Sequence, residues 1–181
     1  MKIILLGYMG SGKTGVGQLL SEKLKLPFLD LDSEISDSEK RSIPEIFRDS
    51  GEIYFRLKET EVLQQTLSSQ TEKFILSVGG GTPCYGKNLQ LMKEAPGSVL
   101  VYLKTSLPEL TRRLLQEKEQ RPLISHLETE ELLNDFIRKH LFERTYYYNQ
   151  SDVVVETDGK TPEEVSEAIF ERLRVLPSSS F

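Results

Sequence analysis

A glycine-rich segment close to the first residue has the residue types and spacing needed to bind phosphate. Gly7-Tyr8-Met9-Gly10-Ser11-Gly12-Lys13-Thr14 fits the pattern G-x-x-x-x-G-K-[ST], in which backbone N–H groups surround phosphate oxygens. Lys13 would reach the outer phosphates of a nucleotide, and the Thr14 hydroxyl would bind Mg²⁺. The alternative is a glycine turn beside a surface lysine. A buried strand before the segment and a helix after it favour the phosphate site, which we expect to use Gly10–Gly15.

Two carboxylates follow the next predicted strand. In Leu29-Asp30-Leu31-Asp32 the acidic residues are two positions apart, a spacing that puts both side chains on one face of a strand. One carboxylate could hold Mg²⁺, which prefers oxygen ligands, while the other accepts the proton of a hydroxyl that attacks a γ-phosphate. The alternative is that Asp30 and Asp32 only cap the next helix.

The third predicted strand ends in Gly79-Gly80-Gly81, which indicates that the backbone approaches another group closely there. Cys84 follows this triplet, and we interpret it as a small packing residue because no base is paired with it. In an open parallel sheet, ligands bind at the carboxyl ends of the strands. The first three predicted strands therefore all place residues suited to ligand binding at the carboxyl edge of the sheet.

Three arginines are candidates for binding anionic groups. Arg56 lies near the start of a helix, where the helix dipole disfavours a cation; it could bind a specific anion or form a solvated pair with Glu59. Arg121 precedes Pro122 in a polar segment and could be carried onto the transferring phosphoryl group by a mobile lid. By periodicity alone, Arg144 is indistinguishable from a surface arginine.

Strand and helix patterns alternate along the chain and predict the elements that position these residues. The predicted strands are Lys2–Leu6, Phe28–Leu31, Phe74–Val78, Ser98–Leu103 and Val153–Glu156. Helices are predicted over Thr14–Lys25, Ser42–Gly51, Ile53–Leu67, Lys87–Lys93, Leu107–Gln116, Thr129–Tyr148 and Pro162–Leu176. This alternation indicates one doubly wound α/β domain over residues 1–176, with parallel strands and right-handed crossovers. The tail 177–181 has no periodicity, and we expect it to be mobile.

Composition restricts the possible partners. Hydrophobic residues make up 38% and charged residues 28% of the chain, as in ordinary globular proteins. The net charge of -5 argues against a nucleic-acid-binding surface. A single cysteine excludes an intramolecular disulfide and a cysteine-based zinc site. Because the sequence has neither a signal peptide nor an apolar run long enough to span a bilayer, we expect a cytoplasmic protein without a membrane partner.

Taken together, the motifs resemble those of the shikimate kinase family, and the resemblance extends from Lys2 to about Leu176. It rests on the glycine-rich loop, Phe28-x-Asp30-x-Asp32, Ser42-Ile43-x-Glu45-Ile46-Phe47, Gly51-Glu52-x-x-Phe55-Arg56-x-x-Glu59, Gly79-Gly80-Gly81, Arg121-Pro122-Leu123, Glu143-Arg144 with Tyr147, and Thr157-Asp158-Gly159 with Pro162. The resemblance implies a three-layer P-loop fold with a five-stranded parallel sheet in the order 2-3-1-4-5. It also implies Mg²⁺-dependent phosphorylation of the 3-hydroxyl of shikimate by ATP, in a monomer.

The resemblance also assigns roles to residues. Asp32 resembles the residue that binds the shikimate hydroxyls and acts as base, and Asp30 resembles the aspartate of the Mg²⁺ shell. The carboxylate of shikimate would be held by Arg56 and Arg144, with Gly79–Gly81 closing the pocket. The remaining implied residues are Arg113 and Lys160–Pro162 around adenine, and Arg121 on the phosphates. The substrate segment would span about 33–61 and the lid about 117–128.

Two departures from the family pattern and two alternatives remain. The segment between Gln116 and Arg121 is rich in Glu and Lys, so the closing of the lid could differ. The family commonly has glycine two residues before its Ser-Ile, where this chain has Lys40, so this turn could differ. A kinase for gluconate or a nucleoside monophosphate would share Lys13 and Thr14. Such an enzyme would not require the aspartate pair, Arg56 and three glycines together. A catalytically silent nucleotide-binding module would be expected to lose Lys13, Asp32 or Arg121.

Overall fold

A five-stranded parallel sheet forms the centre of the molecule. The computed structural model describes residues 1–68, 73–117 and 123–176. The strands are β1 (Lys2–Leu6), β2 (Phe28–Asp30), β3 (Phe74–Ser77), β4 (Ser98–Lys104) and β5 (Val153–Glu156). They pair in the order β2-β3-β1-β4-β5, all in parallel. The predicted order is confirmed, and β1 lies at the centre with its glycine-rich loop at the carboxyl edge.

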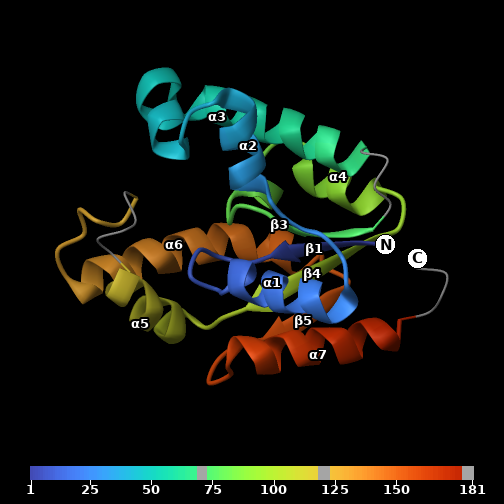
Figure 1. Cartoon of the computed structure of the whole chain (residues 1–181). Coiled ribbons are helices and arrows are strands. Elements are labelled where there is room, and N and C mark those ends of the chain that lie inside the picture. The colour runs from blue at the N-terminus through green and yellow to red at the C-terminus, as the bar shows by residue number, and fades with distance from the viewer. Residues whose placement is uncertain (69–72, 118–122, 177–181) are drawn as a thin grey trace.

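Helices cover both faces of the sheet (Figure 1). They are α1 (Lys13–Leu24), α2 (Leu31–Glu39), α3 (Ile43–Ser68), the 3₁₀ helix η1 (Thr82–Cys84), α4 (Asn88–Glu94), α5 (Leu107–Glu117), α6 (Glu130–Tyr148) and α7 (Pro162–Arg174). In Figure 1, α2, α3 and α4 lie above the strands and α7 lies below them; α1 crosses in front of the strands, and α5 and α6 pack on each other at the left. No helix in the described residues is both long and apolar enough to cross a membrane.

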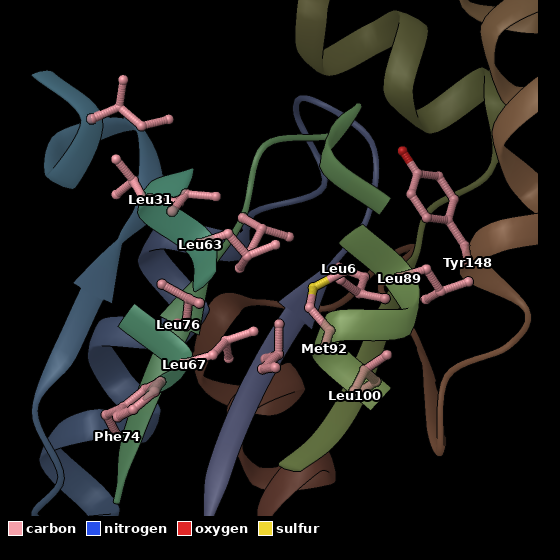
Figure 2. Packing of buried hydrophobic residues seen from close by; sticks show 14 of the residues in the cluster. Leu6, Leu31, Leu63, Leu67, Phe74, Leu76, Leu89, Met92, Leu100 and Tyr148 are labelled. Carbon is pink, nitrogen blue, oxygen red and sulfur yellow. The ribbon is translucent and has the colours of Figure 1, made fainter. Parts of the chain in front are cut away.

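The strand side chains alternate between two cores. Ile4 and Leu6 of β1 point into a cluster with side chains of α3 and α4, whereas Ile3 and Leu5 point into a cluster with α1 and α7. Figure 2 shows the first cluster, in which Leu6 lies beside Met92 and Leu89 of α4. Strands buried on both faces give nearly continuous apolar runs, which is why the sequence predicts them well. Each fully buried leucine or isoleucine contributes roughly 1.5–3 kcal/mol.

The structure corrects the prediction for the segment after β2. The sequence predicted a strand through Leu31 with Asp30 and Asp32 on one strand face, but β2 ends at Asp30 and α2 begins at Leu31. Asp30 is the N-cap of α2, and its carboxylate accepts a hydrogen bond from the Asp32 N–H at 3.1 Å. The capping interpretation therefore describes Asp30 correctly, and the strand-spacing argument was wrong. Only Leu31 and Ile35 of α2 are buried, so this helix has little sequence signal.

Two unusual backbone conformations shape the next segment. The two helices predicted around Gly51 form the single span α3, but Gly51 interrupts it with φ 79° and ψ 174°. Glycine adopts such a conformation at little cost. Before α3, Lys40 has φ 54° and ψ 30°, which is the left-handed region. The turn thus adopts a conformation suited to the family's usual glycine, although lysine there costs roughly 1–2 kcal/mol.

Candidate active site

A cavity of about 680 Å³ lies at the carboxyl edge of the sheet. It brings together segments that are distant in sequence: the glycine-rich loop, the start of α2, the end of β3, α5 and the turn before α7. The candidate residues that line it are Gly10, Ser11, Gly12, Lys13, Thr14, Gly15, Asp30, Asp32, Gly79, Gly80, Arg113, Lys160 and Pro162. This is the edge at which parallel sheets bind ligands.

The glycine-rich loop owes its shape to positive φ angles. Gly10 and Gly12 have φ of 80° and 91°, a region in which side chains are disfavoured. Gly12 is the N-cap of α1, so the first N–H groups of that helix lie where an anion can bind them. Lys13 folds back over the loop, and its Nζ donates to the carbonyl oxygens of Gly7 at 2.8 Å and Tyr8 at 3.1 Å. Phosphate oxygens could replace these carbonyl partners.

Oxygen atoms suited to a hard cation lie beside the loop. The Thr14 hydroxyl donates to Asp30 Oδ2 at 3.4 Å, while Oδ1 of the same carboxylate caps α2. In the described part of the chain, no group of three or more His, Cys, Asp or Glu side chains could hold a metal ion. Mg²⁺ is commonly held by one or two protein oxygens, with water and phosphate oxygens completing its shell. Thr14 and Asp30 fit that pattern.

Asp32 has a raised pKa. Its side chain is open to solvent through the cavity, yet surrounding protein excludes part of its water. This burial raises the pKa of Asp32 to about 6, and the negative charges of Asp30 and Glu59 also raise it. The positive charges of Lys13 and Arg56 lower it. A carboxyl group that titrates near neutrality can both accept and release a proton during a reaction.

Arg56 is held by a buried carboxylate. Its Nη1 donates to Glu59 Oε2 at 3.0 Å, and the Glu59 side chain is 1% exposed. Its Nη2 and Nε make longer contacts of 3.3 and 3.4 Å with Glu52 Oε1, on a side chain that is 56% exposed. The solvated pair considered from the sequence is therefore wrong for Glu59. Arg56 keeps one firm partner in the protein and one exchangeable partner at the surface.

Each glycine of the triplet allows a different close approach. A Cβ at Gly79 would lie 3.0 Å from Thr82 Oγ1 and 3.3 Å from Glu59 Oε1. At Gly80 it would lie 3.2 Å from the backbone nitrogen of Met9, and at Gly81 3.1 Å from Arg56 Nη2. The triplet thus packs between the glycine-rich loop and Arg56: a side chain at Gly80 would press on the loop, one at Gly81 on Arg56, and one at Gly79 on Thr82 and Glu59.

Arg144 of α6 lies beside Tyr8 of the glycine-rich loop and is not among the residues that line the cavity. Its guanidinium is 5.4 Å from the centre of the Tyr8 ring. On the same helix, the Tyr148 hydroxyl donates to the Gly80 carbonyl at 2.5 Å, and in Figure 2 this hydroxyl points away from the aliphatic cluster. The positive charges of Arg144 and Arg56 both act on the thiol of Cys84, although burial dominates and raises the pKa of that thiol to about 11. Both arginines therefore lie near the end of the glycine triplet.

The far end of the cavity is organised by Arg113. Its Nε donates to Glu109 Oε1 at 2.7 Å, Nη1 to the Gly10 carbonyl at 3.3 Å and Nη2 to the Thr157 carbonyl at 3.2 Å. Hydrogen bonds from Arg112, and then from Arg113, lower the pKa of Glu109 to about 2. Arg113 thus joins α5 to both loops that border the cavity. Glu109 was missed in the sequence, although its spacing of four residues from Arg113 is typical of a helical ion pair.

The predicted residues around adenine lie within the described chain, whereas the predicted lid lies within it only in part. Lys160 and Pro162 line the cavity, where Lys160 Nζ donates to the Glu156 carbonyl at 2.8 Å and Pro162 begins α7. Arg121 lies outside the described residues, as does the tail 177–181. The predicted lid at 117–128 is described only at residue 117 and over 123–128.

The sequence and structure can now be compared with known proteins. The family model for shikimate kinase matches residues 9–174. A shikimate kinase of Flavobacterium psychrophilum is 44% identical over 172 residues, which cover 95% of this chain and 98% of that protein. One from Flavobacterium johnsoniae is 45% identical over the same length, with the same coverage of both chains.

Solved structures agree with this match. The crystal structure of shikimate kinase from Bacteroides thetaiotaomicron is similar with a TM-score of 0.86 at 31% identity, covering 97% of this chain and 99% of that one. A shikimate kinase from Acinetobacter baumannii in complex with shikimate gives a TM-score of 0.83 at 32% identity, covering 96% and 92%. A gluconokinase from Sinorhizobium meliloti, at 20% identity and a TM-score of 0.59, shares only the fold. This chain belongs to the shikimate kinase family.

Proposed function

We propose that this protein transfers the γ-phosphate of ATP to the 3-hydroxyl of shikimate, with Mg²⁺, in the synthesis of aromatic amino acids. The observation that carries the proposal is a single cavity in which Asp32, with its pKa near neutrality, is open to the same space as Lys13 and the glycine-rich loop. Family membership supports shikimate as the acceptor.

The donor half of the site binds the nucleotide. Backbone N–H groups over Gly10–Gly15 surround the phosphates, and Lys13 exchanges its carbonyl partners for phosphate oxygens. Thr14 and Asp30 hold Mg²⁺, which neutralises phosphate charge when bound. Adenine lies between Arg113 and the Lys160–Pro162 turn, which border the same cavity.

The acceptor half orients and activates the hydroxyl. Arg56 and Arg144 bind the shikimate carboxylate, for which a guanidinium offers paired N–H donors. The Gly79–Gly81 backbone closes this side of the pocket. Asp32 accepts the proton of the 3-hydroxyl of shikimate. The oxygen of that hydroxyl bonds to the γ-phosphorus, and the bond from this phosphorus to the β–γ bridging oxygen breaks, which releases ADP.

The proposed mobile parts follow the family resemblance. Residues 1–176 act as one kinase domain, in which the segment 33–61 binds substrate and the segment 117–128 closes as a lid. Arg121 on that lid contacts the transferring phosphoryl group.

We also expect the protein to act as a monomer and in the cytoplasm. Light scattering after gel filtration would test the first against the chain mass of 20.7 kDa, and imaging of the tagged protein in its host would test the second.

A coupled assay for ADP release tests the proposed reaction. We expect turnover with MgATP and shikimate, and none with shikimate when EDTA removes Mg²⁺. Gluconate serves as the competing acceptor. Turnover of gluconate without turnover of shikimate would contradict the proposal. The absence of ADP release with either acceptor, together with retained binding of an ATP analogue, would favour a silent nucleotide-binding module instead.

A further inference from the structure

The segment that follows the glycine triplet contacts Arg56 through two independent routes. Thr82 begins η1 and Tyr85 comes directly after it. We propose that Thr82 and Tyr85 are positioning residues that fix the Arg56 guanidinium in the orientation needed to bind a carboxylate ligand. The inference rests on the proposed role of Arg56 in binding the shikimate carboxylate.

The first route passes through Glu59. Thr82 is fully buried, and its Oγ1 donates to Glu59 Oε1 at 2.6 Å, across 23 positions of sequence. The other oxygen of this carboxylate, Oε2, accepts from Arg56 Nη1 at 3.0 Å. Because a separate donor holds each oxygen, the carboxylate cannot rotate without losing a bond. The Thr82 hydroxyl therefore sets the plane of the group that holds Arg56.

Thr82 itself is anchored by the backbone around it. Its N–H donates to the Gly79 carbonyl at 3.1 Å, and its own carbonyl accepts from Asn88 Nδ2 at 3.0 Å. Asn88 is fully buried at the start of α4. The hydroxyl is thus presented to Glu59 from a turn that is secured at both ends, which is what a positioning residue requires.

The second route is the ring of Tyr85. The Arg56 Cζ atom lies 3.9 Å from the ring centre, the distance of a stacked guanidinium. The Tyr85 hydroxyl donates to Glu52 Oε1 at 3.0 Å, and this is the same oxygen that receives the two long contacts from Arg56. The ring therefore restricts movement of the guanidinium out of its plane, while Glu59 restricts rotation within that plane.

The two carboxylates beside Arg56 consequently differ in role. Glu59 is buried and each of its carboxylate oxygens accepts a hydrogen bond, so it stays in place when a ligand binds. Glu52 is exposed and makes only long contacts, so a ligand carboxylate can displace it from the N–H groups of Arg56. A carboxylate can form two parallel hydrogen bonds with arginine only if the N–H groups of the guanidinium point toward it. An arginine side chain that is not held in place would also lose rotamer entropy when the ligand binds, which weakens binding.

Thr82→Val tests the first route because valine has nearly the same shape without the hydroxyl. We expect the KM for shikimate to rise about tenfold, while kcat and the KM for ATP change less than about twofold. Thr82→Ser keeps the hydroxyl and should restore the KM. The matched control is Thr66→Val: Thr66 is also buried on the α3 side, but its hydroxyl bonds only to the Val62 carbonyl at 2.9 Å. An equal rise in KM for Thr66→Val would show a general loss of packing and overturn the proposal.

Tyr85 variants test the second route. Tyr85→Leu removes the ring, and we expect the KM for shikimate to rise about fivefold; Tyr85→Phe keeps the ring and should give the smaller rise. Equal rises for both variants would assign the effect to the hydroxyl and its bond to Glu52 instead of the stacked ring. An unchanged KM in both Thr82→Val and Tyr85→Leu, with Arg56→Lys impaired, would overturn the proposal and leave the proposed function standing.

A measurement on the ligand-free protein separates this proposal from the proposed function. The ¹⁵N NMR signal of the Arg56 Nε–H group, assigned by its loss in Arg56→Lys, reports whether the guanidinium is ordered. We expect a sharp signal in the natural protein and in Thr66→Val, and a broadened signal in Thr82→Val. A signal unchanged by Thr82→Val would overturn the positioning role even if shikimate proved not to be the substrate.

Discussion

In our proposal, the donor and acceptor halves of the site are built in different ways. The phosphate-binding part of the donor half comes from one contiguous segment, Gly7–Thr14, whose binding groups are mostly backbone N–H groups with one lysine. The acceptor half comes from α2, α3, the glycine triplet and α6, and its binding groups are mostly side chains. A local backbone conformation can bind any phosphate, whereas an assembly of side chains from distant elements can select one acceptor.

The two halves also differ in charge. The donor half is cationic around Lys13, while the acceptor half gathers Asp32 and Glu59 close to Arg56, with Asp30 of the donor half beside Asp32. Burial, followed by the negative charges of Asp30 and Glu59, raises the pKa of Asp32 to about 6. In the proposed reaction, the donor half would thus stabilise charge on the nucleotide, and the acceptor half would hold the group that takes a proton.

Replacing Asp32 should give the largest effect and break the acceptor half alone. Asp32→Asn keeps the shape but removes the proton acceptor, so we expect kcat to fall by about 10³-fold. Binding of an ATP analogue, measured by calorimetry, should stay within about threefold of the natural protein. Asp37→Asn, an exposed position on the same helix, is the control. Full activity in Asp32→Asn would remove Asp32 from the mechanism.

The complementary change breaks the donor half. Lys13→Met removes the cation from the loop, and we expect kcat/KM for ATP to fall by about 10²-fold. Binding of shikimate, measured by calorimetry without nucleotide, should be nearly unchanged because Lys13 belongs to the other half. Lys93→Met on α4 controls for loss of a surface lysine. A comparable loss of shikimate affinity in Lys13→Met would show that the halves do not act separately.

The pH profile should sharpen the contrast. Because Asp32 must be ionised to accept a proton and its pKa is about 6, protonation disables the acceptor half as the pH falls through this value. We expect kcat/KM for shikimate to fall about tenfold for each pH unit below about 6. The binding of an ATP analogue should not follow this titration. A flat profile between pH 5 and pH 7 would contradict the role given to Asp32.

The smallest effect is expected inside the acceptor half, where Gly79 packs against Thr82 and Glu59. A methyl group at Gly79 would lie 3.0 Å from Thr82 Oγ1, so Gly79→Ala should cost about 1–3 kcal/mol of unfolding free energy. Urea denaturation checks this value. Gly15→Ala is the stability control, because its Cβ meets nothing within 4 Å and alanine favours the helix. Equal stability for the two variants would mean that the loop relaxes around Gly79.

Much of the fold could be predicted from the sequence because its signals are local. Buried parallel strands are apolar runs, and helices such as α7 carry a capping box at Thr161 and Glu164 and a proline at their start. The helix α2 was missed because only Leu31 and Ile35 face the core. The conformation of the turn at residues 40–42 could not be predicted, because the sequence does not show that Lys40 adopts a left-handed conformation.

By itself, the sequence determined the phosphate-binding loop, the strand order expected from the family motifs, and the aspartates and arginines as candidates. Only the tertiary structure decided that Asp30 caps α2, that Glu59 is buried, and that Tyr85 stacks on Arg56. The reason is the range of the interactions. A glycine loop takes its shape from neighbouring φ and ψ angles, whereas Thr82 reaches Glu59 and Tyr85 reaches Arg56 only through packing of α3 against the segment that follows the glycine triplet.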